Sequence, residues 1–188
     1  MIPQIGVDSA PADLLSYLMV THIRETLSAG TAELYYSLYE MKGVPSGGTA
    51  STLIGLFQRY SIAEVTKSMK AWSMSPVPAP PKTQADSQRG LMEKVLGVRT
   101  VQDLGVLTTS LQGAVDATQV YRSWGLIGKG EYYGPKFRFR PYMNARNVFT
   151  GVLIHLAITF GFMALLLSPI RTLLRRLVYQ PGEGPARE

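Results

Sequence analysis

The sequence has no cysteine and only two histidines, His22 and His155. The absence of cysteine excludes disulfide frameworks, thiolate metal clusters and cysteine nucleophiles, and two histidines so far apart argue against a zinc site made by the protein alone. Charge is also scarce, because charged residues make up 17% of the chain and hydrophobic residues 46%. Soluble domains usually have about a quarter charged residues. We therefore expect some segment of the chain to contact lipid.

The length of 188 residues fits one domain with an appendage and is short for two domains of full size. Lys and Arg number 19 and Asp and Glu number 13, which gives a formal net charge of +6. Much of this excess flanks a single apolar run, between Lys136 and Arg146 on one side and between Arg171 and Arg176 on the other. The basic excess therefore has a definite location in the chain.

Hydrophobic spacing and turn residues predict a mixed α/β (α+β) fold, a sheet with covering helices. The first predicted helix has apolar residues at Leu14, Leu15, Leu18, Ile23 and Leu27. Ser61 and Glu64 have the spacing of a capping box. The predicted elements are a helix from Ser9 that Gly30 ends, a strand over Thr31 to Met41, a helix from Thr49, a helix from Ser61 to about Trp72 and a helix from about Thr109 to Trp124.

Composition divides the chain further. The prolines at 76, 78, 80 and 81 predict an exposed, extended connection over residues 73 to 90. The expected segments are an N-terminal α/β segment (1–72), a Pro-rich linker or insertion (73–105), the C-terminal part of the α/β domain with a basic aromatic loop (106–147), a hydrophobic membrane-anchor helix (148–168) and a basic tail (169–188).

The segment from Val148 to Ser168 has no charged residue unless His155 is protonated. About twenty helical residues span the roughly 30 Å hydrocarbon core of a bilayer, so the segment predicts a transmembrane helix. A buried core helix and a partly embedded monotopic anchor are the alternatives, and basic residues on both sides leave the orientation open. The basic residues expected to flank the membrane are Lys136, Arg138, Arg140, Arg146, Arg171, Arg175 and Arg176.

Two short motifs are candidates for lining a cleft. The first lies at the start of the first helix, where backbone amides could hold an anion, although the same residue types cap ordinary helices. The second is a glycine pair that allows close approach of a ligand. Neither is a P-loop or a dinucleotide-binding glycine pattern, and we assign no catalytic residue and no metal ligand. The cleft candidates are Asp8, Ser9, Asp13, Ser46, Gly47, Gly48 and Thr49.

Aromatic and basic residues alternate from Tyr132 to Arg140. Such alternation can bind single-stranded nucleic acid. The adjacent apolar run favours a membrane surface instead, because juxtamembrane Lys and Arg attract anionic head groups. A plain amphipathic strand, with Phe137 and Phe139 inward and Arg138 and Arg140 outward, is an equally good interpretation. We expect no nucleic-acid partner.

Several short motifs occur in order along the chain: GVDSAPAD at 6–13, EMKG at the end of the predicted strand, SGGTAST at 46–52, YRSWGL, YYGPKFRFRPYM and ARN up to 147, and PGEGP after the apolar segment. Together they resemble the saccharopine dehydrogenase-like oxidoreductases. The resemblance covers most of the chain and is weakest over residues 73–105.

The resemblance implies an NAD(P)-dependent oxidoreductase with an N-terminal Rossmann domain and a second α/β domain. It also implies association with membranes or lipid droplets and, in fungal relatives, a link to glycolipid metabolism. In such a protein a Rossmann domain would precede residue 6, so we expect this chain to be the C-terminal portion, from a truncated gene product or a gene model that starts late. We expect no NAD(P) binding by the chain alone, because the glycine loop and its acidic partner are absent. NAD(P) is expected for a full-length relative.

Two functions follow as expectations. The first is the substrate or association domain of such an oxidoreductase, bound to a membrane and inactive alone, which leaves open whether the chain is itself an enzyme. The alternative is a non-enzymatic membrane-anchored module that binds a partner or lipid. The expected location is a lipid droplet, a mitochondrial membrane or another intracellular membrane. An exposed sheet edge would also favour self-association.

Overall fold

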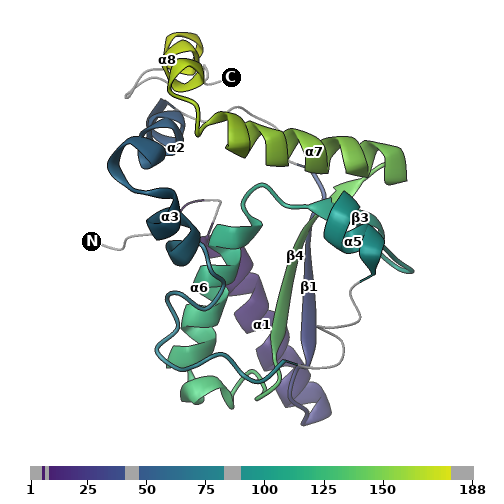
Figure 1. Ribbon diagram of the computed structural model, residues 1–188. Coiled ribbons are helices and arrows are strands. Elements are labelled where there is room, and N and C mark those ends of the chain that lie inside the picture. The colour runs from purple at the N-terminus through teal and green to yellow at the C-terminus, as the bar shows by residue number, and fades with distance from the viewer. Residues whose placement is uncertain (1–5, 7–8, 41–46, 83–89, 179–188) are drawn as a thin grey trace, which may run out of the picture. The chain divides into compact units, whose positions relative to one another are not determined.

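The computed structural model describes residues 6, 9–40, 47–82 and 90–178. The chain divides into two compact units, which we call the sheet unit (Met1–Tyr39 and Ser68–His155) and the helical unit (Glu40–Lys67 and Leu156–Glu188). In chain order the elements are α1 (Ala10–Leu27), β1 (Glu33–Leu38), α2 (Gly47–Arg59), α3 (Ile62–Ser68), α5 (Leu91–Leu96), β2 (Val98–Val101), β3 (Gly105–Thr109), α6 (Gly113–Leu126), the short 3₁₀ helix η1 (Gly128–Gly130), β4 (Arg138–Ala145), α7 (Val148–Ala164) and α8 (Ser168–Leu177), as Figure 1 shows.

A mixed four-stranded sheet forms the centre of the sheet unit, with the strand order β1-β4-β3-β2. β1 runs parallel to β4, and β3 runs antiparallel to both β4 and β2. This confirms the mixed α/β class predicted from the sequence. β3 ends at Thr109, opposite Tyr142, so residues 138–141 of β4 have no partner in β3. The backbone N–H of Phe139 donates instead to the Tyr121 hydroxyl at 2.9 Å, and Pro141 has no N–H to satisfy.

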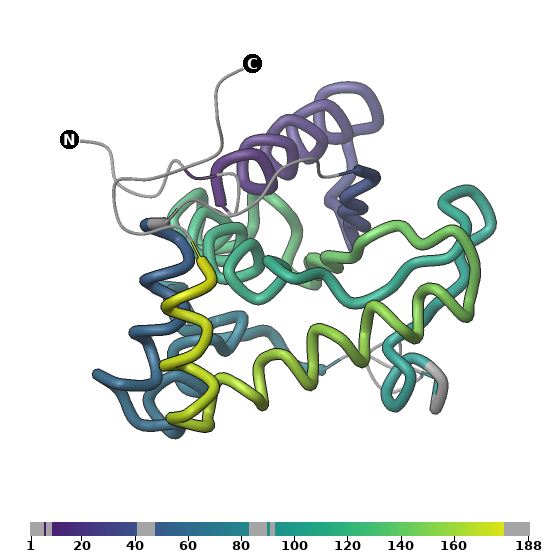
Figure 2. The backbone as a smooth tube through the Cα atoms, turned by 90° about the horizontal axis from the view of Figure 1, so that it is seen from above, coloured from purple at the N-terminus to yellow at the C-terminus, as the bar shows by residue number. Residues whose placement is uncertain are grey.

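The core of the sheet unit lies between the sheet and the helices α1 and α6, which Figures 1 and 2 show side by side. Phe137 and Tyr133 are fully buried, with ring centroids 5.1 Å apart. Trp72 adds a stacked ring on Tyr121, with centroids 3.6 Å apart. Aromatic side chains thus supply most of the apolar volume of this core.

α1 buries its small residues and not its leucines. The buried positions are Ala12, Ser16 and Val20, which recur every four residues and form one helix face. Leu14, Leu15, Leu18 and Leu27, which belong to the apolar set identified in the sequence, are exposed by half or more. Small side chains allow α1 to lie close to α6, so the face chosen for packing is set by shape as well as by hydrophobicity.

Several predicted helix boundaries agree with the structure to within a few residues. The capping box is confirmed, because the Ser61 N–H donates to Glu64 Oε2 at 2.8 Å and the Glu64 N–H donates to Ser61 Oγ at 3.3 Å. The backbone N–H and the hydroxyl of Ser61 both donate to Glu64 Oε2, and these two bonds hold the pKa of Glu64 below its usual value. The first helix ends before Gly30, because Ser28 adopts the left-handed conformation with φ 50° and donates its N–H to the Arg24 carbonyl.

The arginines of β4 correct one expectation. Arg138 and Arg140 were expected to point outward, but their exposed fractions are 6% and 5%. β4 lies between β1 and β3 in the sheet, and acceptor groups from Glu33 and from residues 80 and 81 contact the two guanidinium groups. Arg138 donates to the carbonyls of Pro80 and Pro81, and Arg140 pairs with Glu33. The Pro-rich connection therefore contributes backbone acceptors to a buried cation.

The apolar C-terminal run forms α7 and continues into α8. α7 ends at Ala164, and α8 leaves it at an angle of 109°. Within the described residues no helix taken singly is long and apolar enough to cross a membrane, and only the bent pair passes that test. Arg171 fixes the bend by donating to the carbonyls of Leu165 and Leu166 at 2.7 and 2.8 Å. These carbonyls would otherwise lack partners at the end of α7.

Candidate functional site

The cleft candidates predicted from the sequence fall in different units. Ser9 and Asp13 belong to the sheet unit, whereas Gly47, Gly48 and Thr49 form the first turn of α2 in the helical unit. Asp8 and Ser46 lie outside the described residues. Ser9 is buried at the start of α1, where its hydroxyl donates to the Gly6 carbonyl at 3.3 Å.

Asp13 joins α1 to α6. Its Oδ2 accepts a hydrogen bond of 2.7 Å from the Ser123 hydroxyl. Burial raises the pKa of Asp13 above its usual value, although the Ser123 hydrogen bond and the charge of Arg122 both act to lower it. These contacts give Asp13 a structural part in helix packing.

The basic residues predicted to flank a membrane divide into two sets. Arg138 and Arg140 are buried in the sheet unit. Arg171 is partly buried and caps α7. The exposed set is Lys136, Arg146, Arg175 and Arg176. Only this second set is available to a surface partner.

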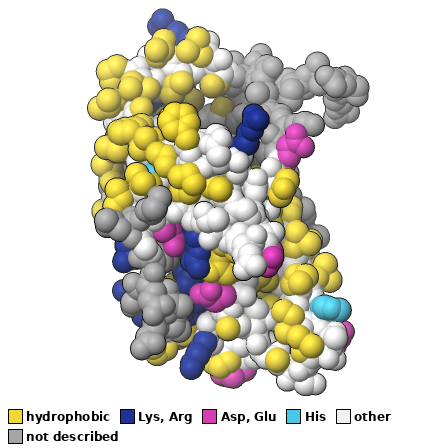
Figure 3. Space-filling model, turned by 90° about the vertical axis from the view of Figure 1, so that its right-hand side faces the viewer, with side chains coloured by type: hydrophobic (Ala, Val, Ile, Leu, Met, Phe, Trp, Pro, Cys, Tyr) yellow, Lys and Arg dark blue, Asp and Glu magenta, His cyan; other side chains and the backbone are white. Residues whose placement is uncertain are grey.

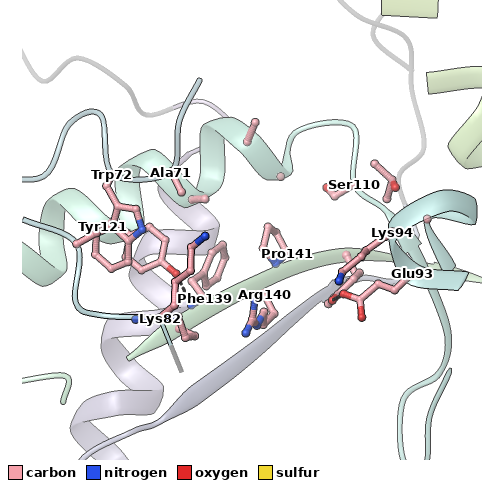
Figure 4. A pocket seen from close by; sticks show the side chains of 18 of the residues that line it. Ala71, Trp72, Lys82, Glu93, Lys94, Ser110, Tyr121, Phe139, Arg140 and Pro141 are labelled. Carbon is pink, nitrogen blue, oxygen red and sulfur yellow. Dashed lines mark hydrogen bonds between the residues drawn. The ribbon is translucent and has the colours of Figure 1, made fainter. Parts of the chain in front are cut away.

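A groove of about 1090 Å³ runs along the edge of β4 that β3 leaves uncovered. Figure 4 shows Trp72 and Tyr121 at one end, Glu93 and Lys94 at the other, and Arg140 and Pro141 between them. α6 forms one wall, and the chain after Trp72 forms part of the other. The groove thus has an aromatic end and a polar end.

The arginines of this groove have defined partners. Arg140 lies 3.0 Å from Glu33, whose second oxygen accepts from the Tyr35 hydroxyl at 3.1 Å. At the polar end Glu93 accepts from the Tyr142 hydroxyl at 2.8 Å and lies 3.4 Å from Arg99. Both carboxylates are therefore held by cations and phenols, and the groove carries more positive than negative charge through its lysines and arginines.

A second candidate surface is apolar and lies on α7 and α8. Phe149, Leu153, Leu156, Phe160 and Met163 are exposed and recur at helical spacing, so they form one stripe along α7. In α8 the apolar side chains of Ile170, Leu173, Leu174 and Leu177 lie opposite the arginines, and α8 has no buried residue. Figure 3 shows hydrophobic side chains gathered at the upper left of the face that it presents.

Polar contacts tie the first turns of α7 to the sheet. The Thr108 hydroxyl donates to the Gly151 carbonyl at 2.7 Å, and the Thr109 hydroxyl lies 2.8 Å from His155 Nδ1. His155 thus bonds a threonine hydroxyl, although a backbone carbonyl is its commoner partner inside an apolar helix. Gly151 lets the helix approach closely, because a Cβ there would lie 3.2 Å from Val98 Cγ2.

Comparisons with protein-family models, with curated proteins and with solved structures find no match to this chain. Within the described ranges, no group of three or more His, Asp and Glu side chains is arranged to hold a metal ion.

Sequence reasoning did not find the groove, because its walls come from distant segments. Trp72 was placed at the end of a predicted helix, Pro80 in a linker and Tyr121 inside another helix. The signal available in the sequence was the pair Arg138 and Arg140, which alternate with two phenylalanines. A buried guanidinium needs acceptors, and the prolines at 80 and 81 supply carbonyls without competing N–H donors.

Proposed function

We propose that this protein is a peripheral membrane module that lies on anionic bilayers through α7 and α8, embedded in the plane of the interface. The observation that carries this proposal is the exposed apolar stripe of α7, followed by an amphipathic helix whose opposite face carries arginines. Helices with one apolar face and one cationic face bind membranes in this way, with the apolar face in the head-group region.

The charge distribution supports an anionic surface as the partner. No Asp or Glu occurs from Tyr132 to Gly182, whereas Lys136, Arg146, Arg175 and Arg176 of this stretch are basic and exposed. Each Lys or Arg near an anionic surface contributes about 1 kcal/mol of attraction. A water-soluble protein partner would also have to cover the apolar stripe, but it would not require a stretch free of acidic residues.

The ties between α7 and the sheet support an in-plane helix over a spanning one. The bonds to Gly151 and His155 belong to the first two turns of α7. Moving these turns into hydrocarbon would break both bonds and leave polar groups without partners. The bend after Ala164 also supports an in-plane arrangement, because it divides the apolar run into two helices at 109°.

Flotation with lipid vesicles tests the proposal. The full chain is expected to float with vesicles of phosphatidylcholine and phosphatidylserine, to float less with phosphatidylcholine alone, and to be released by alkaline carbonate. The Phe160→Ser/Met163→Ser variant should lose flotation. Leu14→Ser/Leu18→Ser is the matched control, because it removes two equally exposed apolar side chains from α1 and should float like the wild type.

Two outcomes contradict the proposal. Equal flotation of the stripe variant and the wild type would show that α7 is not the contact. Retention after alkaline carbonate would favour the spanning helix predicted from hydropathy. The oxidoreductase assignment stays a prediction from the sequence resemblance, and titration of the chain with NADH and NADPH tests the expectation that neither binds.

A further inference from the structure

α6 begins at the polar end of the groove, and its N-cap residue makes no capping hydrogen bond with its side chain. Gln112 precedes the helix without a capping hydrogen bond from its side chain, and the Asp116 N–H makes the first regular bond, to the Gln112 carbonyl at 3.0 Å. The N–H groups of Ala114 and Val115 precede that bond and point out of the helix end. A helix of 14 residues also has the positive end of its dipole there.

Ser110 gives the independent sign that a ligand belongs at this helix end. The residue is 8% exposed and lines the groove, and its Oγ is buried with no hydrogen-bond partner among the described residues. A buried hydroxyl without a partner is costly, so its place beside this helix end calls for an acceptor that the described residues do not supply.

The neighbouring charges favour an anion. Lys94 lines the same end of the groove, as Figure 4 shows. Glu93, beside it, is already engaged by Tyr142 and Arg99. Asp116, the acid of the first turn of α6, is fully buried and does not line the groove. Lys94, the Ser110 hydroxyl and the N-terminus of α6 therefore lie at the same end of the groove. Among the described residues that line the groove, the acidic side chain is that of Glu93, which is already paired.

The other end of the groove suits a flat apolar group. From Gly113 to Tyr121 the wall formed by α6 is about 12 Å long, at 1.5 Å per residue. Trp72 stacks on Tyr121 there, and Phe139 completes the aromatic lining. A ligand with an anionic head and an aromatic body could therefore contact both ends of the groove.

We propose that this groove binds a small molecule that carries a phosphate group on an aromatic body, with the phosphate at Ser110, Lys94 and the N-terminus of α6 and the aromatic body near Trp72 and Tyr121. Helix N-termini bind phosphate through free N–H groups and the helix dipole. The site lies within the sheet unit, so the proposal is independent of membrane binding.

Calorimetric titration of the full chain with biphenyl-4-yl phosphate, inorganic phosphate and 4-phenylphenol tests the proposal. Biphenyl-4-yl phosphate is expected to bind saturably, inorganic phosphate about ten-fold more weakly, and 4-phenylphenol without detectable heat. Ser110→Ala should weaken biphenyl-4-yl phosphate binding about ten-fold, the usual effect of losing one hydrogen bond to a charged group. The melting temperature of this variant should not fall, because the removed hydroxyl has no partner within the part of the chain that the structure describes.

Lys94→Gln should also weaken binding and should reduce its dependence on salt concentration. Lys70→Gln is the matched control, because Lys70 is exposed in the same unit and does not line the groove. The proposal is overturned if biphenyl-4-yl phosphate does not bind, or if it binds Ser110→Ala as tightly as the wild type. Equal affinity for inorganic phosphate would overturn the part that assigns the aromatic end to the ligand.

Discussion

The core of the sheet unit and the C-terminal helices are both strongly apolar, but they use their hydrophobic side chains in opposite ways. Phe137 in the core is 0% exposed, whereas Phe160 on α7 is 61% exposed. The core phenylalanine meets Tyr121 and Tyr133 in edge-to-face contacts. Hydropathy assigns the same value to both phenylalanines, so only packing distinguishes the core residue from the exposed one.

The same contrast occurs within α7. Gly151 is its only buried residue, and it lies in the turns that Thr108 and Thr109 hold against the sheet. Ten residues later, no described residue outside the helix lies within 4 Å of the position where a Cβ of Gly161 would stand. One uninterrupted apolar sequence therefore contains a segment packed on protein and a segment that presents its side chains to the surroundings.

The largest expected difference in stability is between alanine variants of the two phenylalanines. Phe137→Ala should lower the free energy of unfolding by about 3–5 kcal/mol, because it removes a fully buried ring and leaves a cavity. Phe160→Ala should change it by less than about 0.5 kcal/mol, because the ring is exposed. Urea unfolding followed by circular dichroism measures both. A large loss of stability in Phe160→Ala would show that α7 is covered by protein, contrary to the contrast drawn above.

Sequence patterns predicted the elements better than their packing. The capping box at Ser61 and Glu64 and the strand that became β1 were found because their signals are local. The packing face of α1 was not found, because close approach to α6 selects Ala12, Ser16 and Val20, and no local rule ranks small side chains above leucines. The burial of Arg138 and Arg140 was missed for a related reason, since it depends on Glu33 and on carbonyls of residues 80 and 81.

The two candidate sites also differ in whether local sequence or contacts between distant residues determine them. The apolar run from Val148 was visible in the sequence because a long stretch without charged residues is a local signal. Its bend after Ala164 was not, because it depends on Arg171 reaching back to two carbonyls. The groove could not be predicted at all, since Trp72, Lys94, Ser110 and Tyr121 come together only when β3 stops short of the middle of β4.

The two glycines of α7 sharpen the contrast within that helix. Gly151→Leu should destabilise the protein by about 1–3 kcal/mol, because even a Cβ would lie 3.2 Å from Val98 and 3.4 Å from Ala145. Gly161→Leu should stabilise it by about 0.5 kcal/mol through helix propensity, since its surroundings are open. Thermal unfolding of both variants compares them directly. If the two substitutions had equal effects, the packed and open segments of α7 would not differ as described.

The smallest effect concerns pH and the carboxyl group of Asp13 in the sheet unit, whereas α7 and α8 contain no acidic residue. Burial raises the pKa of Asp13 above 3.8 in the folded protein, so the folded state binds this proton more tightly than the unfolded state. The stability that this proton contributes is present at low pH and is lost as pH rises through the raised pKa. Asp13→Asn removes this contribution, so the unfolding free energy of the wild type relative to the variant should fall over that pH range and stay level above it.

Asp103→Asn, in the exposed turn between β2 and β3, is the control and should follow the wild type. Denaturant unfolding at a series of pH values measures the difference, and parallel curves for Asp13→Asn and the wild type would show that burial of this carboxyl is not coupled to folding.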